Sequence, residues 1–388
     1  MTQKLYYENA YIFEFTATVE NIIDFEGKTA VILDKTAFFP EGGGQPGDEG
    51  YIDNAPVFDT KIDNGIIYHF ISDSYSFSAG SIVQCCVNKE VRFARMQAHT
   101  GEHIVSGIAH SLFGVNNIGF HMDNTVMTVD FDKYLSKEEL AKLEKAANNC
   151  VYKNVRVNAW FPNDEELKEL TYRSKLDDFD ETRIVEIEGY DACACCAVHL
   201  SSTGEVGLIK ILTSAKHRGG VRLTLICGIT AYEDYVIKYD NTLIISDLLC
   251  SKHNEANEAV IKLLQKEKEL KYMIAEKTNT LIKYIFDTSE FSEQSIVFRI
   301  NGLNNEELKQ AAIMLKEKSA GITVIVSGDD CEGYYFAAAS NAVKINDFTK
   351  IITSSLNGSG GGRYDVIQGR LNSDYNTIKS FFDKLTVN

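Results

Sequence analysis

The chain lacks any uninterrupted apolar run of the ~18 residues that a membrane-spanning helix needs. It also lacks a signal-peptide pattern, because its opening segment MTQKLYYENAYIFEF is too polar and carries Glu8 and Glu14. These two absences argue against a protein that enters or crosses a membrane. We therefore expect a soluble protein located in the cytoplasm.

A secreted disulfide framework is missing as well. The nine cysteines include the adjacent pairs Cys85–Cys86 and Cys195–Cys196, and they are spread over a chain of 388 residues. Small secreted domains are where dense disulfides are expected, so a reducing compartment fits this cysteine usage better. At this length, with 44% hydrophobic residues, the chain can bury more than one core, and two or three domains are expected.

Positive charge is in short supply, with 39 Lys and Arg against 55 Asp and Glu and a formal net charge of −16. Such a balance repels a polyanion at long range. Basic residues nevertheless gather beside two segments rich in histidine and cysteine, where they could hold a few phosphates. Solvated surface charge is the alternative interpretation. The candidates are Arg92, Arg95, Lys216, His217, Arg218 and Arg222.

Two short clusters of metal-binding side chains stand far apart in the sequence. His99 and His103 lie four apart in MQAHTGEHIVSGIAH, and Cys195 and His199 lie four apart in DACACCAVHL. On a helix, positions i and i+4 share a face, so both histidines can point at one ion. A thiolate and a third imidazole complete a tetrahedral set that suits Zn²⁺. From spacing alone, Cys193 or Cys196 could replace Cys195.

Residues 1–90 have the pattern of a small β-barrel or sandwich. Short β-branched and aromatic runs alternate there with Asp-Gly, Asn-Gly and other glycine-containing turns. Within them lies the loop FFPEGGGQPGDEG, which contains Gly42, Gly43, Gly44 and Gln45. Glycines let the backbone approach a ligand closely or take positive φ. A long hairpin turn explains the same residues.

The remaining chain changes pattern twice. Residues 91–234 predict an α+β domain: a helix carries the two histidines and ends at Gly114, and a later hairpin bends at Gly219 and Gly220. Residues 235–290 repeat leucine and alanine every seven positions between many Lys and Glu, which is typical of a helical, coiled-coil linker. Residues 291–388 alternate strands and helices as a small α/β domain. The whole is an α+β, multidomain chain.

A glycine run near the end of the chain, NGSGGGRYDVIQGR, invites a phosphate-binding interpretation. It is not G-x-G-x-x-G in register, and it lacks the Lys-Ser/Thr pair of a P-loop, so a mononucleotide site is not indicated. Gly360, Gly361, Gly362 and Arg363 could instead clamp a nucleic-acid backbone through amides and a guanidinium. A flexible loop is the alternative.

Several unusual motifs occur in the same order as in the editing domain of alanyl-tRNA synthetases. The chain resembles that domain in PEGGGQPGDEG, in HTGEH, in the Cys195-to-His199 spacing followed by STGEVGLIKI, and in RGGVR. GGGRYDVIQG resembles the glycine-rich motif of the C-terminal domain of that synthetase, a domain also attached to DHH phosphoesterases. Nearly the whole chain is covered, without the aminoacylation domain. It is therefore similar to the long-form AlaX proteins, the stand-alone relatives of the editing domain.

This resemblance implies a trans-editing hydrolase that deacylates tRNA(Ala) charged with serine, and also with glycine. It implies Zn²⁺ held by His99, His103, Cys195 and His199. It also implies tRNA(Ala) as partner, and the helical segment or the C-terminal domain offers a surface for a homodimer. Both motifs depart from the family pattern. The second motif often reads Cys-Gly-Gly-Thr-His, whereas this chain has Cys196-Ala197-Val198 between Cys195 and His199, and Glu102 stands where the first motif often has threonine.

The roles of the predicted site residues leave alternatives open. Glu102 precedes His103 and could be a general base, a carboxylate that binds the substrate's amine, or an exposed helix charge. The segment from Gly42 to Gln45 could line an aminoacyl pocket that detects a serine hydroxyl. Four protein ligands leave zinc no open corner, so the ion either changes coordination or only orders the pocket. Two alternative functions therefore remain open. The first is a tRNA-binding protein with structural zinc, and the second is a zinc hydrolase of another small ester or amide.

Overall fold

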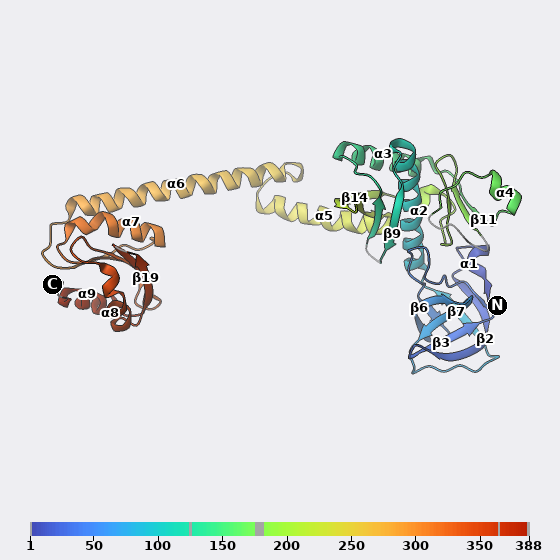
Figure 1. Ribbon diagram of the computed structural model, residues 1–388, viewed down its shortest axis with the longest axis horizontal. Helices are drawn as coiled ribbons and strands as arrows, with labels where there is room; N and C mark the ends of the chain where they lie inside the picture. The colour runs from blue at the N-terminus through green and yellow to red at the C-terminus, as the bar shows by residue number, and fades with distance from the viewer. Residues whose placement is uncertain (1, 124–125, 175–181, 364, 386–388) are drawn as a thin grey trace. The chain divides into compact units, whose positions relative to one another are not determined.

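The computed structural model describes residues 2–123, 126–174, 182–363 and 365–385. The chain divides into two compact units, Met1–Ile244 and Ile245–Asn388, whose elements Figure 1 labels along the chain. Each unit mixes helices with β-sheets, so the predicted α+β, multidomain class is confirmed at that level. The four predicted domain boundaries stay a prediction. No helix among the described residues is both long and apolar enough to cross a lipid bilayer.

The first part of unit 1 is a sheet whose strand pairings close into a ring. The order is β2-β3-β7-β6-β5-β8, and β8 pairs back onto β2. Burial alternates along β8, which places Val83, Cys85 and Val87 in the interior. The strands are β2 (Glu14–Phe25), β3 (Lys28–Leu33), β5 (Gly50–Ile52), β6 (Ala55–Asp63), β7 (Ile66–Ile71) and β8 (Ile82–Val87). Beside them lie β1 (Gln3–Lys4), α1 (Leu5–Glu8) and β4 (Lys35–Thr36).

A single long helix, α2 (Lys89–Phe113), carries the predicted histidines. Asn88 caps its first turn by accepting a hydrogen bond from the Val91 amide at 3.2 Å. The helix ends, as predicted, at Gly114, whose φ of 61° is the left-handed conformation that glycine adopts without strain. Most of the middle of this helix is buried, including many polar residues, because sheets and a second helix surround it.

Two further sheets and helix α3 pack around α2, and a short helix, α4, lies on the surface. One sheet has the order β14-β15-β10-β9 and the other β11-β12-β13. The capping box that Ser136 and Glu139 form at the start of α3 is present, as its sequence signature predicts. The strands are β9 (Asn117–Met122), β10 (Met127–Phe131), β11 (Val157–Trp160), β12 (Ile184–Ile187), β13 (Asp191–Ala194), β14 (Ile209–His217) and β15 (Gly220–Cys227). The helices are α3 (Lys137–Lys153) and α4 (Asp164–Glu169).

The helical segment predicted after residue 234 is present as two helices. They are α5 (Gly228–Leu248) and α6 (Ala256–Thr288). Within unit 2, the end of α6 packs through buried Ile282 against the same core as α7 (Asn305–Leu315). Much of the apolar surface of α6 is exposed, including Leu263 and Leu270.

Unit 2 is a five-stranded sheet with helices on both faces. Its order is β16-β17-β18-β20-β19, and only β16 and β17 pair in parallel. Helix α7 covers one face, and α8 (Thr349–Ser355) and α9 (Tyr375–Lys384) cover the other. The strands are β16 (Ile296–Arg299), β17 (Thr323–Asp329), β18 (Gly333–Ala339), β19 (Ser359–Arg363) and β20 (Val366–Leu371).

The glycine run of unit 2 is a strand rather than the predicted loop. Gly360, Gly361, Gly362 and Arg363 belong to β19, the edge strand, and pair antiparallel with β20. Gly362 has no room for a side chain, since a Cβ there would lie 2.0 Å from the Val366 carbonyl oxygen. The close approach of β20 therefore explains why position 362 is a glycine, which the flexible-loop interpretation had explained by mobility.

Candidate metal centre

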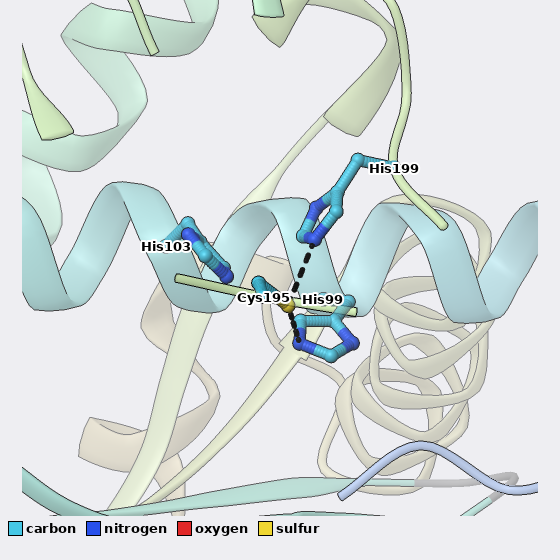
Figure 2. A group of neighbouring side chains, drawn as sticks. All are labelled: His99, His103, Cys195 and His199. Atoms are coloured by element: carbon cyan, nitrogen blue, oxygen red, sulfur yellow. Dashed lines mark hydrogen bonds between the residues drawn. The ribbon is translucent and has the colours of Figure 1, made fainter. Parts of the chain in front are cut away.

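Four side chains from two distant segments meet inside unit 1. Helix α2 presents His99 and His103 from successive turns, and the segment after β13 presents Cys195 and His199 (Figure 2). The Cys195 Sγ lies 3.6 Å from His99 Nε2 and 3.4 Å from His199 Nε2. The ligand atoms of all four residues lie within 4.8 Å of one another, so this group could hold a metal ion.

Each histidine of the group is oriented by a hydrogen bond on its other ring nitrogen. The Nδ1 of His99 lies 2.9 Å from Gln45 Oε1, and that of His103 lies 3.2 Å from Asp191 Oδ2. The Nδ1 of His199 lies 3.3 Å from the Thr100 hydroxyl. Supporting contacts of this kind fix the tautomer and turn the remaining nitrogen toward an ion.

The charges of the group suit a cation. Burial raises the pKa of the Cys195 thiol, but His99, His103 and His199 outweigh burial and hold that pKa well below its usual range. Burial lowers the pKa of His199 to about 3, which keeps its imidazole neutral. Burial lowers the pKa of His103, but Asp191 and the Cys195 thiolate outweigh burial and hold that pKa well above its usual range, so zinc would displace a proton from this ring. A thiolate and imidazoles are the donor types that zinc binds, so these residues fit that ion.

The structure distinguishes the three clustered cysteines. Among the described residues, the group that could hold a metal contains Cys195 and neither of its neighbours. The Cys193 side chain is buried and contacts the Ala194 carbonyl at 3.6 Å. Cys196 lies against the glycine loop, where a Cβ on Gly43 would come within 3.4 Å of its sulfur.

The glycine loop packs directly on the histidine and cysteine group. Gly42 and Gln45 close it by two backbone hydrogen bonds of 3.0 Å. Gly44 has φ of +80°, and a Cβ there would lie 2.7 Å from the Phe120 ring, so only glycine fits. The loop thereby delivers Gln45 to His99, while the buried Gln45 Nε2 has no hydrogen-bond partner.

Glu102 is buried beside the group and is not an exposed helix charge. Its side chain is 3% exposed and accepts hydrogen bonds from Ser106 Oγ, at 2.6 Å, and from Asn117 Nδ2. Its Oε2 lies 3.8 Å from His103 Nε2. A carboxylate held in this way can receive a proton or bind an ammonium group.

A cavity of about 320 Å³ opens onto the group. Its wall contains the metal-binding residues His99, His103 and Cys195, together with Glu102. The rest of the wall has aromatic and basic side chains that the sequence patterns did not single out. These are Tyr7, Phe120, Phe161, Arg173 and Arg183.

Arg173 and Asp191 also escaped the sequence analysis, although both support the site. The Arg173 guanidinium donates to both Asp191 carboxylate oxygens at 2.7 Å, and Asp191 in turn contacts His103. Asp191 is the first residue of the strand that leads to Cys195, and this nearness in sequence is the one signal that could have pointed to Asp191. Arg173 lies far enough away in the chain that only folding connects it to the site.

Two predicted tRNA-binding arginines are buried instead, so that assignment was wrong. Arg92 is fully buried, forms an ion pair with Asp48 and donates to the Ala10 and Ala37 carbonyls. Arg95 is 5% exposed and donates to the Gly47 carbonyl and the Glu49 carboxylate. Both side chains join α2 to the strand ring and leave no guanidinium face for a phosphate.

The basic residues of the β14–β15 hairpin lie on the surface. The predicted hairpin is confirmed, but its two-residue turn is Arg218-Gly219, one position earlier than predicted, and Arg218 has φ of 45°. Arg218 is exposed and lines a surface hollow with Tyr134 and Lys216. Arg222 points its guanidinium at Asp130, which accepts at 2.6 and 2.7 Å.

Three family models match successive parts of this chain. Residues 2–91 match "tRNA synthetases class II (A)", and residues 182–224 match the "Threonyl and Alanyl tRNA synthetase second additional domain". Residues 292–387 match the DHHA1 domain. The chain carries alanyl-tRNA synthetase-type domains and fits an AlaX-like protein.

Curated relatives agree with these matches over nearly the whole chain. Alanine–tRNA ligase of Pyrococcus abyssi is 30% identical over 95% of this chain and 42% of its own length. The Methanococcus maripaludis ligase is 29% identical over 97% of this chain and 43% of its own length. This chain thus spans about two fifths of these relatives. A solved C-Ala domain from Aquifex aeolicus alanyl-tRNA synthetase covers 23% of this chain, with 20% identity and a TM-score of 0.21.

Proposed function

We propose that this AlaX-like chain is a zinc-dependent trans-editing hydrolase that deacylates tRNA(Ala) mischarged with serine or glycine. The observation that carries the proposal is the group of His99, His103, Cys195 and His199 at the end of a cavity. The match to the second additional domain covers Cys195 and His199. An aminoacyl ester is an activated bond, so a positioned water and one polarised carbonyl suffice for its hydrolysis.

The four ligands would hold zinc, and a bound zinc would supply Lewis-acid chemistry to the ester carbonyl only if its coordination changes, because four protein ligands leave no open position. The protein's own groups supply the rest. Gln45, Asp191 and Thr100 hold the three imidazoles in place. Glu102, on the cavity wall, receives the proton of the attacking water. The buried Ser106 and Asn117 side chains keep that carboxylate from turning away.

Substrate selection would follow from the size of the cavity where Gly43 of the glycine loop lines it. A site that hydrogen-bonds a substrate hydroxyl discriminates far better than one that senses a missing methylene. The unpartnered Gln45 Nε2 is a buried amide donor on this loop and could mark the serine hydroxyl. Exposed Arg218, and Arg363 with the glycine strand Gly360–Gly362 in unit 2, are proposed contacts for the tRNA backbone.

The test measures release of labelled serine from Ser-tRNA(Ala) beside Ala-tRNA(Ala), with zinc-loaded wild type. Cys195→Ala is the site variant, and Cys196→Ala is the matched control because it changes the adjacent cysteine outside the group. We expect release of serine and little release of alanine by the wild type. Cys195→Ala should lose zinc and activity, whereas Cys196→Ala should keep its zinc by elemental analysis.

Two results would overturn the proposal in different ways. Tight binding of Ser-tRNA(Ala) without release, by folded zinc-loaded protein, would leave a tRNA-binding protein with structural zinc. Equal hydrolysis of a free serine ester and of Ser-tRNA(Ala) would instead indicate a zinc hydrolase that does not recognise tRNA.

A further inference from the structure

Arg183 is a buried arginine on the cavity wall with an unusual set of partners. Its side chain is 7% exposed and lines the cavity that ends at the metal-binding group. Both N–H groups of its Nη1 are used, since this atom donates to the Cys195 carbonyl at 3.1 Å and to the Ala197 carbonyl at 2.7 Å. Its Cζ lies 5.0 Å from the centre of the Tyr7 ring.

Within the described part of the chain, no acidic side chain pairs with the other edge of the Arg183 guanidinium. A guanidinium has five N–H donors, and the edge formed by Nε and Nη2 matches the two oxygens of a carboxylate or phosphate. Arg173 and Arg222 each place this edge on an aspartate. Among the residues that the structure describes, no carboxylate comes within ion-pair distance of Arg183.

The cavity around this arginine is larger than a seryl or glycyl group requires. At about 320 Å³ it lies in the size range of sites that enclose a whole small ligand. Tyr7 and Phe161 form an aromatic pair on its wall, with ring centres 5.3 Å apart. Aromatic rings of this kind stack on unpaired nucleobases, so the wall suits the terminal nucleoside that carries the ester.

The chemistry of the substrate then identifies the anion. In an aminoacyl ester the carboxylate of the amino acid is consumed by the ester bond, so the amino acid offers the arginine no anion. The terminal nucleotide of a tRNA carries one phosphodiester, on the 5′ side of the same ribose. Because Arg183 is held to the carbonyl of Cys195 itself, its open edge lies within one nucleotide of the metal-binding group.

We propose that the Nε and Nη2 edge of Arg183 binds the 5′-phosphate of the terminal nucleotide, with its base on Tyr7 and Phe161. This inference rests on the proposed function. It makes Arg183 the residue by which the site tells a nucleotide ester from a nucleoside ester or a free amino-acid ester. Arg183 is thus a specificity residue, and the metal-binding group and Glu102 remain the reacting centre.

The test compares two non-hydrolysable probes that differ only in the phosphate. They are 3′-seryl-amino-3′-deoxyadenosine and its 5′-monophosphate, and calorimetry measures their binding to the zinc-loaded full chain. We expect the wild type to prefer the phosphorylated probe by about tenfold or more, as for a charge-assisted hydrogen-bonded pair. In Arg183→Gln this preference should fall to near unity. Arg156→Gln, which removes an exposed arginine outside the cavity, should keep it.

Other outcomes separate this inference from the proposed function. Equal loss of affinity for both probes in Arg183→Gln, with the preference retained, would overturn the inference and assign Arg183 to holding the Cys195 segment. The Arg183→Lys variant, and the zinc content of each variant, show independently whether the Cys195 segment keeps its place. If the wild type prefers the phosphorylated probe yet releases no serine from Ser-tRNA(Ala), the proposed function fails while the phosphate site stands.

Discussion

At the scale of single residues, the buried carboxylate of Glu102 decides how the site would work. It occupies a position where the related motif often has threonine, yet it is not on the surface. Burial of a carboxylate is costly unless hydrogen bonds or charges compensate it, and here Ser106, Asn117 and His103 do so. A group kept at such cost next to a cavity is a candidate for chemistry rather than for solubility.

Replacing Glu102 by Gln tests its role as proton acceptor. The amide keeps the shape of the side chain but cannot take a proton from water, so kcat on Ser-tRNA(Ala) should fall by about 10²-fold or more with KM little changed. Steady-state kinetics on the zinc-loaded variant measures both constants. Glu90→Gln, an exposed glutamate on the same helix, is the control. An increased KM with unchanged kcat would contradict the base role and assign Glu102 to the substrate's amine.

At the scale of elements, the site depends on two short segments that pack against α2 and bring its histidines together with the other side chains of the metal-binding group. In the glycine loop at Gly42–Gln45, Gly44 has no room for a side chain beside Phe120, and the segment after β13 turns Cys195 toward α2. Neither segment is regular secondary structure. Their conformations are set by close contacts with Phe120, Arg173 and Arg183 rather than by local propensity.

A pair of glycine substitutions separates backbone strain from lost space. Gly44→Ala and Gly65→Ala both place a side chain at φ near +80°, but only the Cβ at Gly44 meets a neighbour, at 2.7 Å from Phe120. Both should lose about 1 kcal/mol of unfolding free energy from the backbone. Gly44→Ala should lose more, and it should also weaken zinc binding by moving Gln45 from His99. Urea unfolding and a chelator competition measure the two effects, and equal losses in both variants would refute the packing argument.

At the scale of the whole molecule, α6 carries a long apolar stripe that the described part of its own unit leaves exposed. Val260, Leu263, Leu270, Ile274 and Leu281 are each between 38% and 60% exposed. They follow the alternating three- and four-residue spacing of a coiled-coil seam, interrupted at Glu267 and Lys277. A second copy of the same helix would cover this stripe.

We therefore expect a homodimer that forms through α6. Sedimentation equilibrium of the full chain should give twice the monomer mass at micromolar concentration, and Leu263→Glu with Leu270→Glu should return it to the monomer. Lys266→Glu, which reverses a charge outside the stripe, should leave the dimer intact. A monomeric wild type at tens of micromolar would exclude this role for the helix.

The sequence by itself determined the parts of this protein that rest on local rules. The four-residue spacing of His99 and His103 predicted ligands on one helix face, and the Gly114 cap and the Ser136 capping box predicted helix ends that the structure confirms. The motif order predicted the family. The helix face and the two helix ends depend on residues within one or two turns of chain, where backbone geometry leaves few alternatives.

Only the tertiary structure decided which charges are available for function. Arg92, Arg95 and Arg183 look alike in sequence, but Asp48 and Glu49 neutralise the first two in the interior, whereas the third lines the cavity beside the metal-binding group. The same holds for Cys195 among three neighbouring cysteines, and for a glycine run that pairs as strand β19. Partners of buried polar groups come from distant segments, so their pairing is set by packing, which local sequence does not encode.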